Sequence, residues 1–143
     1  MRAVKLIRLS DTTGTATDGI ELKAENRHLR RKLLVTESGA EVLVDLPLSI
    51  FIADGDHLEL EDGTFLEVRA AEEKLLEIRG ANPAHIVQLA WHIGNRHLAA
   101  QLEYDRILIL PDGVIAQMLE QRGATLKIVH EQFSPEYGAY HGH

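Results

Sequence analysis

The first half of the chain alternates apolar and polar residues in short runs, and this period of two is typical of β-strands with one buried face. Turn residues such as Gly39 and the pair Asp62-Gly63 separate the runs, and Pro47 is expected to end the hairpin strand before it. The predicted strands cover residues 4–9, 20–22, 30–35, 41–45, 57–61 and 64–69. Short strands at this spacing predict a small β-sandwich or barrel.

The second half alternates strands with amphipathic helices. A strand over residues 75–79 precedes a helix that begins at Asn82-Pro83, because Asn is a favoured N-cap and Pro a favoured first helical residue. Apolar residues at helical spacing follow, and Gly94 predicts the end of this helix. The remaining predicted elements are strands over 101–104 and 106–110, a helix from 111–113 to Gly123, and a strand over 125–131. The order β-α-β-β-α-β is that of a ferredoxin-like unit.

The composition of residues 70–74, which are polar and lack Gly and Pro, marks a change between the two patterns. We therefore predict an α+β protein with a β-rich domain over residues 1–74 and a ferredoxin-like domain over residues 75–132. Residues 133–143 contain Pro, Gly, Tyr and His, and are expected to form a mobile tail that buries little. An alternative continues the strand to Gly80 within a single domain.

Composition and charge exclude several functional classes. The 143 residues are 45% apolar and 26% charged, with a net charge of −7 and no cysteine. The absence of cysteine excludes disulfides, thiolate metal sites and thiol nucleophiles, and the negative charge argues against nucleic acid as a partner. No apolar run approaches the roughly 18–20 residues of a membrane span, and the first residues lack the apolar core of a signal peptide. We therefore expect a cytoplasmic protein that does not bind membranes.

Histidine is the one residue type whose distribution points to a chemistry. Six of the eight histidines lie between residues 75 and 143, and imidazole is the commonest protein ligand for transition metals. His97 follows His92 by five residues with Gly94 between them, so the two rings need not share a helix face. On spacing alone, His97 is an exposed residue beyond a helix C-terminus, where the helix dipole favours a protonated ring.

A single exposed imidazole cannot hold a transition metal well, because such ions need two to four donor groups. A two-fold homodimer resolves this difficulty, since an isologous interface brings the same residue of both subunits to the axis. His141 and His143, which alternate with glycine at the end of the chain, could add imidazoles to a metal held elsewhere. A site of this kind would be open and able to release its metal, as a carrier requires.

The remaining histidines and charged clusters suggest no further site. His85 and His130 are interpreted as polar residues on a half-buried surface, and His28 and His57 as surface residues. Residues 27–32 form a basic patch, either a solvated face or a contact for an acidic partner. No nucleophile elbow, P-loop or dinucleotide motif is present, so an enzyme is not expected. The alternatives are a protein-interaction adaptor whose histidines are incidental and, less well supported, a small hydrolase with a His-bound metal.

The run Gly94-Asn95-Arg96-His97, followed by Gln101 and the segment 111–123, resembles the urease accessory protein UreE family of nickel metallochaperones. The ending at residues 138–143 and the Asp-Gly-Asp segment at residues 54–56 are also similar. The resemblance covers most of the chain. It implies the same pair of domains, with partner or peptide binding in the first and metal binding and dimerisation in the second.

The resemblance also implies a set of ligands and partners. His97 would bind Ni²⁺ with its mate from the other subunit, His141 and His143 would add ligands, and His92 would assist. Zn²⁺ or Cu²⁺ could substitute, because imidazole binds all three ions. The dimer would deliver nickel to apo-urease together with other accessory proteins, among them a GTPase. Some members carry a further His pair near the second helix, where this chain has Pro111 and Gly113.

Overall fold

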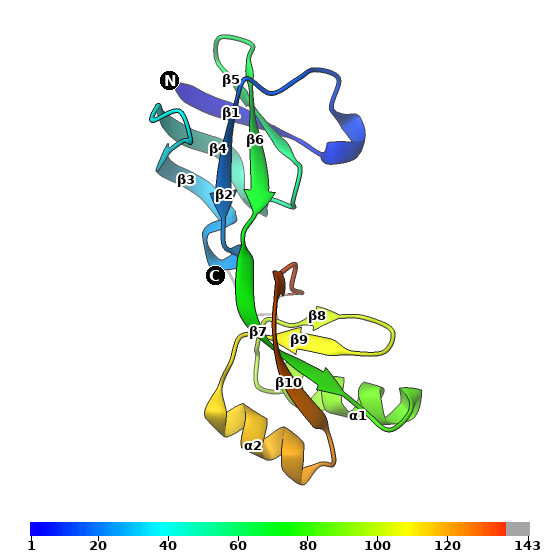
Figure 1. Cartoon of the computed structure of the whole chain (residues 1–143). Helices are drawn as coiled ribbons and strands as arrows, with labels where there is room; N and C mark the ends of the chain where they lie inside the picture. Colours follow the sequence, from blue (N-terminus) through cyan, green and yellow to red (C-terminus); the bar gives the residue numbers. More distant parts are fainter. Residues whose placement is uncertain (137–143) are drawn as a thin grey trace. The chain divides into compact units, whose positions relative to one another are not determined.

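The computed structural model describes residues 1–136 and divides the chain into two compact units, Met1–Ala71 and Glu72–His143 (Figure 1). The division falls three residues before the predicted boundary at residue 74. The reason is that β7 (Glu72–Arg79) begins within the segment predicted to be a linker. We call the two parts the N-terminal unit and the C-terminal unit, and describe each by itself.

The N-terminal unit is a curled, six-stranded mixed sheet with the strand order β2-β6-β5-β1-β4-β3 (Figure 1). Its strands are β1 (Arg2–Ile7), β2 (Asp18–Leu22), β3 (His28–Val35), β4 (Glu41–Phe51), β5 (His57–Leu60) and β6 (Phe65–Ala70), with short 3₁₀ turns at Leu9–Asp11 and Ala24–Asn26. The pairs β1–β4 and β2–β6 are parallel and the others are antiparallel. Alternate residues fill the core, as the period of two predicts: Ala3, Ile20, Leu29, Leu34, Val42, Val44, Leu46, Ile52, Leu58, Leu60, Leu66 and Val68.

The prediction that the strand ends at Pro47 is wrong, because β4 continues to Phe51. Leu29 of β3 lies opposite Ile50, whereas Arg31 lies opposite Asp45, so the stretch of β4 that holds Pro47 bulges out of register. A residue within a bulge is not paired with the neighbouring strand. A proline there therefore removes no hydrogen bond of the ladder, although it lacks an N–H.

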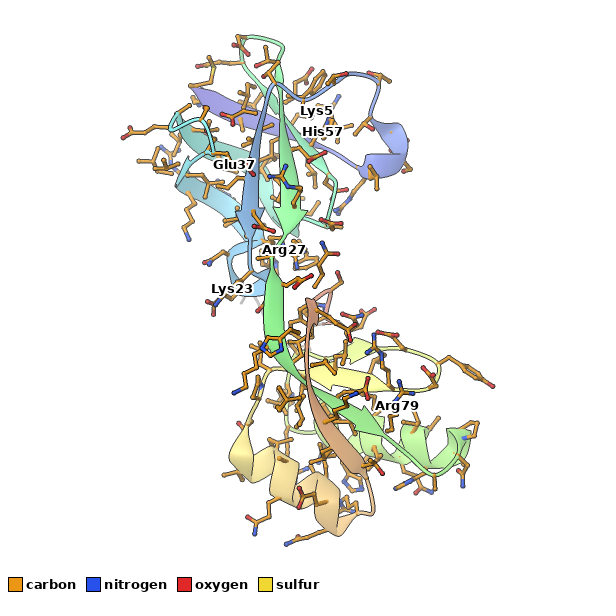
Figure 2. All side chains as sticks on the ribbon, in the orientation of Figure 1. Lys5, Lys23, Arg27, Glu37, His57 and Arg79 are labelled. Carbon is orange, nitrogen blue, oxygen red and sulfur yellow. The ribbon has the colours of Figure 1, made fainter. Side chains whose placement is uncertain are left out.

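Two residues predicted to be at the surface of this unit are buried (Figure 2). The ring of His57 lies 5.8 Å from that of Phe65. The guanidinium of Arg27 is fully buried and donates hydrogen bonds to the carbonyls of Leu22 (3.1 Å) and Ile52 (3.0 Å). The carbonyl of Leu22, at the end of β2, also accepts from the backbone N–H of Ala71 (2.9 Å), and Ile52 follows the last residue of β4. A side chain with several N–H donors can serve both carbonyls. Arg27 is therefore not part of a solvated basic patch.

The C-terminal unit has the predicted order β7-α1-β8-β9-α2-β10, in which α1 is Pro83–Gly94, β8 Gln101–Leu102, β9 Ile107–Ile109, α2 Gly113–Gln121 and β10 Thr125–Gln132. Its four-stranded sheet has the order β10-β7-β9-β8 and is antiparallel throughout, which is the ferredoxin-like arrangement. The predicted α+β fold class is thereby confirmed.

Both helices of this unit begin where the sequence predicts. The side chain of Asn82 accepts a hydrogen bond from the backbone N–H of His85 (2.9 Å), and Asp112 accepts one from Ile115 (3.0 Å). These are N-cap contacts, which satisfy donors that a helix start leaves without a partner. The helices cover one face of the sheet, and the core between them contains Leu76, Ile78, Ile86, Leu89, Ile93, Ala100, Ile107, Ile109, Ile115 and Leu119.

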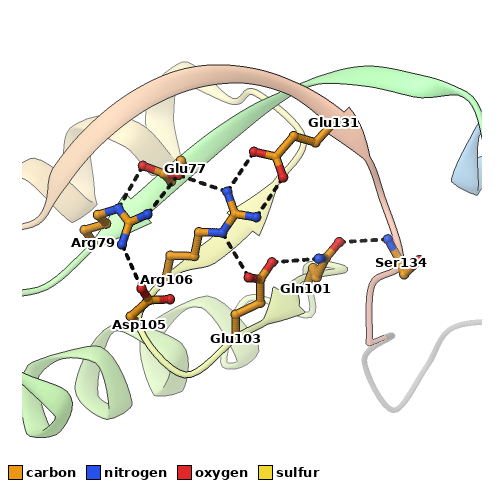
Figure 3. Close-up of polar contacts among 8 residues, drawn as sticks. All are labelled: Glu77, Arg79, Gln101, Glu103, Asp105, Arg106, Glu131 and Ser134. Atoms are coloured by element: carbon orange, nitrogen blue, oxygen red, sulfur yellow. Dashed lines mark hydrogen bonds and ion pairs between the residues drawn. The ribbon is translucent and has the colours of Figure 1, made fainter.

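The opposite face of this sheet carries what we call the Arg106 network: Arg106 with Glu77, Arg79, Glu103 and Glu131 (Figure 3). Arg106 forms two 2.7 Å hydrogen bonds to Glu131, and reaches Glu77 at 3.0 Å and Glu103 at 3.1 Å. Burial alone would raise the pKa of Glu77, but hydrogen bonds from Arg79 and Arg106 hold that pKa below its usual value. Arg106 also lowers the pKa of Glu131.

Residues 133–136, which we call the C-terminal strap, return to the start of β8. The backbone N–H of Ala100 donates to the carbonyl of Glu136 (3.0 Å), and the N–H of Glu136 donates to the carbonyl of Ala100 (2.7 Å). Phe133 is buried. The expectation that residues from 133 onward bury little is therefore wrong for the strap, because an aromatic ring and paired backbone hold it in place. Residues 137–143 lie outside the described part of the chain.

Candidate metal-binding site

His97 lies in a tight turn that follows the last residue of α1. The backbone N–H of His97 donates to the carbonyl of Gly94 (3.0 Å). The backbone N–H of Asn95 donates to the carbonyl of Trp91 (2.9 Å) and completes the last turn of the helix. His97 has a φ of +59° and is the one non-glycine residue with positive φ in residues 1–136. This left-handed conformation ends the helix, as glycine often does, but here it places an exposed imidazole at that end.

The position of His97 favours positive charge. The carbonyls at a helix C-terminus leave a partial negative charge of roughly half an electron, which stabilises a cation within the last turn. From the sequence, we expected the helix dipole to favour a protonated imidazole at His97. The same field also stabilises a metal cation bound to a neutral ring, so it does not by itself exclude a metal site.

His92 lies within α1 and faces a different environment. It is half-buried and lines a cavity of about 220 Å³ between α1 and α2, together with His85 and Arg122. Burial, followed by the positive charges of Arg122 and Arg96, lowers the pKa of His92. These effects favour the neutral ring, which is the form that binds metals.

His85 uses both of its ring nitrogens within the protein. Nδ1 accepts a hydrogen bond from the backbone N–H of Ala81 (2.9 Å), so Nε2 carries the proton and donates to the carbonyl of Arg122 (2.8 Å). His85 thus ties the start of α1 to the end of α2. It is a structural residue, as its interpretation as a half-buried polar residue suggested.

The structure brings none of the candidate ligands into a preformed cluster. Within residues 1–136, no group of three or more His, Asp or Glu side chains is arranged to hold a metal ion. His141 and His143 lie outside the described residues. His130, the other histidine of this unit, is exposed on β10 opposite Lys74. A metal site at His97 would therefore need ligands from the end of the chain or from a second copy.

Sequence reasoning missed an apolar surface on the outer side of α1. Val87 and Trp91 lie outside the predicted apolar face of the helix and are strongly exposed. With Leu102 and Tyr104 from the β8–β9 hairpin, Val87 borders an apolar groove of about 320 Å³. The signal was present in the sequence, because Val87 and Trp91 are spaced by four residues and form a second stripe on α1.

Two models of the UreE urease accessory protein match the chain: the N-terminal domain model over residues 3–71 and the C-terminal domain model over residues 73–143. The chain belongs to the UreE family. The two matches meet where the structure divides the chain, between Ala71 and Glu72. Membership confirms the resemblance that was noted around His97.

Most of this chain is similar in sequence to proteins named urease accessory protein UreE. The protein from Rhizobium etli is 54% identical over 127 residues, which are 89% of this chain and 63% of the relative. The protein from Brucella anthropi is 52% identical over 142 residues, which are 99% of this chain and 84% of the relative. The chain thus spans less than two thirds of the length of the Rhizobium etli protein. No helix within residues 1–136 is long and apolar enough to cross a membrane.

Proposed function

We propose that this UreE family member is a nickel carrier that binds Ni²⁺ as cargo and delivers it to apo-urease during assembly of the urease active site. The observation that carries the proposal is the position of His97: exposed, in a left-handed turn, at the negative end of α1. The family name of the relatives supports the link to urease. We further propose that the carrier works in the cytoplasm with apo-urease and other accessory proteins, including a GTPase.

The carrier requires a homodimer, and the exposed stripe on α1 offers a surface for one. Val87 and Trp91 are one turn apart, and the same line along the helix continues to Gly94, just before His97. If two copies bury this stripe against each other around a two-fold axis that passes close to the C-terminal end of α1, the two copies of His97 face each other across that axis. Two imidazoles then share one ion, with Zn²⁺ or Cu²⁺ as possible substitutes.

The end of the chain can reach the same ion. Glu136 is paired with Ala100, which follows His97 by three residues. His141 comes five residues after Glu136, and an extended chain of that length spans at most about 18 Å. We propose that His141 and His143 add ligands to the His97 pair, and that His92 assists from the neighbouring turn of α1.

Partner binding is proposed for the N-terminal unit. The strands β1 and β4 diverge beyond their paired residues and leave an apolar groove of about 260 Å³. Its lining includes Val4, Leu6, Leu46, Leu48 and Ile50. The same groove supports the alternative function, a protein-interaction adaptor whose histidines are incidental, so metal binding itself must be measured.

Replacement of His97 is expected to weaken nickel binding by about 100-fold or more, because loss of a direct ligand costs at least as much as loss of its supporting contacts. His97→Asn is the preferred variant, since Asn tolerates positive φ and leaves the turn intact. A chain cut after Tyr140 should bind nickel about ten-fold more weakly than the full chain. Isothermal titration calorimetry with Ni²⁺ measures both changes.

The matched control is His130→Asn, which removes another exposed histidine of the same unit and should bind nickel as the wild type does. The wild type should bind one tightly held ion for every two chains. Negligible heat in all four proteins would favour the adaptor. Equal losses in the two histidine variants would show that His97 has no special role.

Val87→Glu is expected to shift the protein from dimer to monomer, because it places a carboxylate in the apolar stripe. Val87 is 68% exposed, and Val114 on α2 is 78% exposed, so Val114→Glu makes the same change at a matched site away from the stripe. Sedimentation equilibrium distinguishes the two states. A dimer that persists in Val87→Glu but dissociates in Val114→Glu would move the interface to α2.

A further inference from the structure

The end of α1 is closed by a side chain as well as by the backbone. The backbone N–H of Arg96 donates to the carbonyl of Ile93 (3.1 Å), three residues earlier, in a tightened last turn. The carbonyl of His92, which would accept that N–H in a regular α-helix, is left for another donor. The guanidinium of Arg96 donates to it through Nη1 (3.1 Å). Arg96 therefore holds a positive charge against the last turn of α1.

The charge of Arg96 is not compensated by an acidic neighbour. Residues 80–102 contain no Asp or Glu. Within the described residues 1–136, no carboxylate forms an ion pair with Arg96. The charge also acts on a ring of the same helix, because burial, Arg122 and Arg96, in that order, lower the pKa of His92. The end of α1 thus carries a full positive charge of its own.

This charge lies at the same helix end as the candidate metal ligand. His97 follows Arg96 directly, and its backbone N–H binds the carbonyl of Gly94, two residues after the carbonyl that Arg96 binds. The partial negative charge of a helix C-terminus stabilises one cation within the last turn, and Arg96 already supplies a cation there. A metal dication on the neighbouring imidazole would also be repelled by the guanidinium.

We propose that Arg96 limits the affinity of the His97 site for Ni²⁺ by placing a fixed positive charge at the end of α1, so that the cargo can be released. This inference rests on the proposed function and deepens it. A guanidinium has no acceptor with which to bind a metal, so Arg96 acts on the ion through its charge alone. In a dimer, both copies of Arg96 would contribute.

The test compares three substitutions of Arg96 in the full chain, with Ni²⁺ as the probe in isothermal titration calorimetry at low salt. Arg96→Gln removes the charge but retains an N–H donor, Arg96→Met removes both, and Arg96→Lys retains both. The Gln and Met variants should bind Ni²⁺ about five-fold more tightly than the wild type, the upper range for one charge at a helix end. The Lys variant should bind as the wild type does.

Two further readouts distinguish a charge effect from a structural effect. Loss of Ni²⁺ to an excess of chelator should be slower in Arg96→Gln, because differences in affinity lie mostly in dissociation. The gain in affinity should shrink between about 0.01 M and about 1 M salt, since the Debye length falls from about 30 Å to about 3 Å. A change in the shape of the turn would not depend on salt in this way.

The matched control is Lys127→Gln, which removes one positive charge from an exposed position on β10 of the same unit. It changes the net charge of the chain as much as Arg96→Gln does. Nickel binding of this variant should equal that of the wild type at both salt concentrations.

Each other outcome overturns the inference. Weaker binding in both Arg96→Gln and Arg96→Met would mean that Arg96 serves the site by holding the turn. Unchanged binding in Arg96→Gln, or equal gains in Arg96→Lys or Lys127→Gln, would remove the local effect of the charge while leaving the carrier intact. A wild type that takes up no nickel would remove the carrier, and the inference with it.

Discussion

Replacement of Arg106 by Met is expected to lower the free energy of unfolding of the C-terminal unit by about 2–4 kcal/mol. Arg106 is 16% exposed and serves three carboxylates, those of Glu77, Glu103 and Glu131. Removing the guanidinium leaves these charges close together, and Glu77 is nearly buried. Breaking a buried ion pair from one side costs more than the pair contributes, because the remaining charge is left without compensation.

The matched control is Arg79→Met, which removes a neighbouring arginine of the same network. Arg79 is 44% exposed and its loss should cost less than about 1 kcal/mol, as is usual for solvent-exposed pairs. Urea unfolding followed by the fluorescence of Trp91 measures both variants, because the single tryptophan lies in the C-terminal unit. Equal destabilisation by the two substitutions would contradict the central role of Arg106.

Arg106→Met should also change the pH dependence of the free energy of unfolding. The pKa values of Glu77 and Glu131 are lowered in the folded protein, so their contribution is present above the unfolded-state pKa of about 4.3. It is lost as the pH falls through the folded-state values. Arg106→Met should therefore show a shallower loss of stability below about pH 4.5 than the wild type does. A parallel pH profile would contradict the assigned cause of the lowered pKa values.

Replacement of Arg27 by Met is expected to destabilise the N-terminal unit by about 1–3 kcal/mol, because the carbonyl of Ile52 loses a buried donor, whereas that of Leu22 keeps the N–H of Ala71. The guanidinium also lies 4.9 Å from the centre of the Phe51 ring, where a cation is favoured. Arg27→Lys should recover part of the loss, since it retains a charged donor but only one donor atom.

The control for Arg27 is Arg30→Met, an exposed arginine of β3 whose loss should change stability by less than about 0.5 kcal/mol. All tryptophan and tyrosine residues lie in the C-terminal unit. The N-terminal unit must therefore be followed by circular dichroism or by hydrogen exchange. Indistinguishable unfolding of the Arg27 and Arg30 variants would show that the buried contacts contribute nothing.

The features that the sequence predicted well depend on near neighbours along the chain. Asn82 and Asp112 start their helices through contacts three residues away, and turn glycines such as Gly63, with a φ of +85°, allow tight hairpins. These signals were sufficient for the order of elements in the C-terminal unit, and that order restricts the topology to few choices.

The failures all involve partners that are distant in the sequence. Pro47 is accommodated by a bulge against β3, and Arg27 is enclosed partly through the carbonyl of Ile52, which lies 25 residues further along the chain. A basic residue among other basic residues gives no local sign that it will be enclosed. The same holds for the strap, whose partner Ala100 lies far upstream of Glu136.

The candidate site shows the same limit. The end of α1 and the exposure of His97 followed from Gly94 and the residues around it. The left-handed backbone of His97 and the apolar stripe through Val87 and Trp91 emerged only from the structure. The roles of His92, His141 and His143 stay predictions that the titrations test.

The pairing of Ala100 with Glu136 has a consequence for how the carrier would behave on dilution. A ligand tethered a few residues from its target acts at an effective concentration in the millimolar range, whatever the concentration of the protein. In the proposed carrier, His141 follows the paired residue Glu136 by five positions of the same chain, whereas the second His97 comes from another subunit. If His141 and His143 are ligands as proposed, a dissociated protomer would therefore keep part of its affinity for nickel.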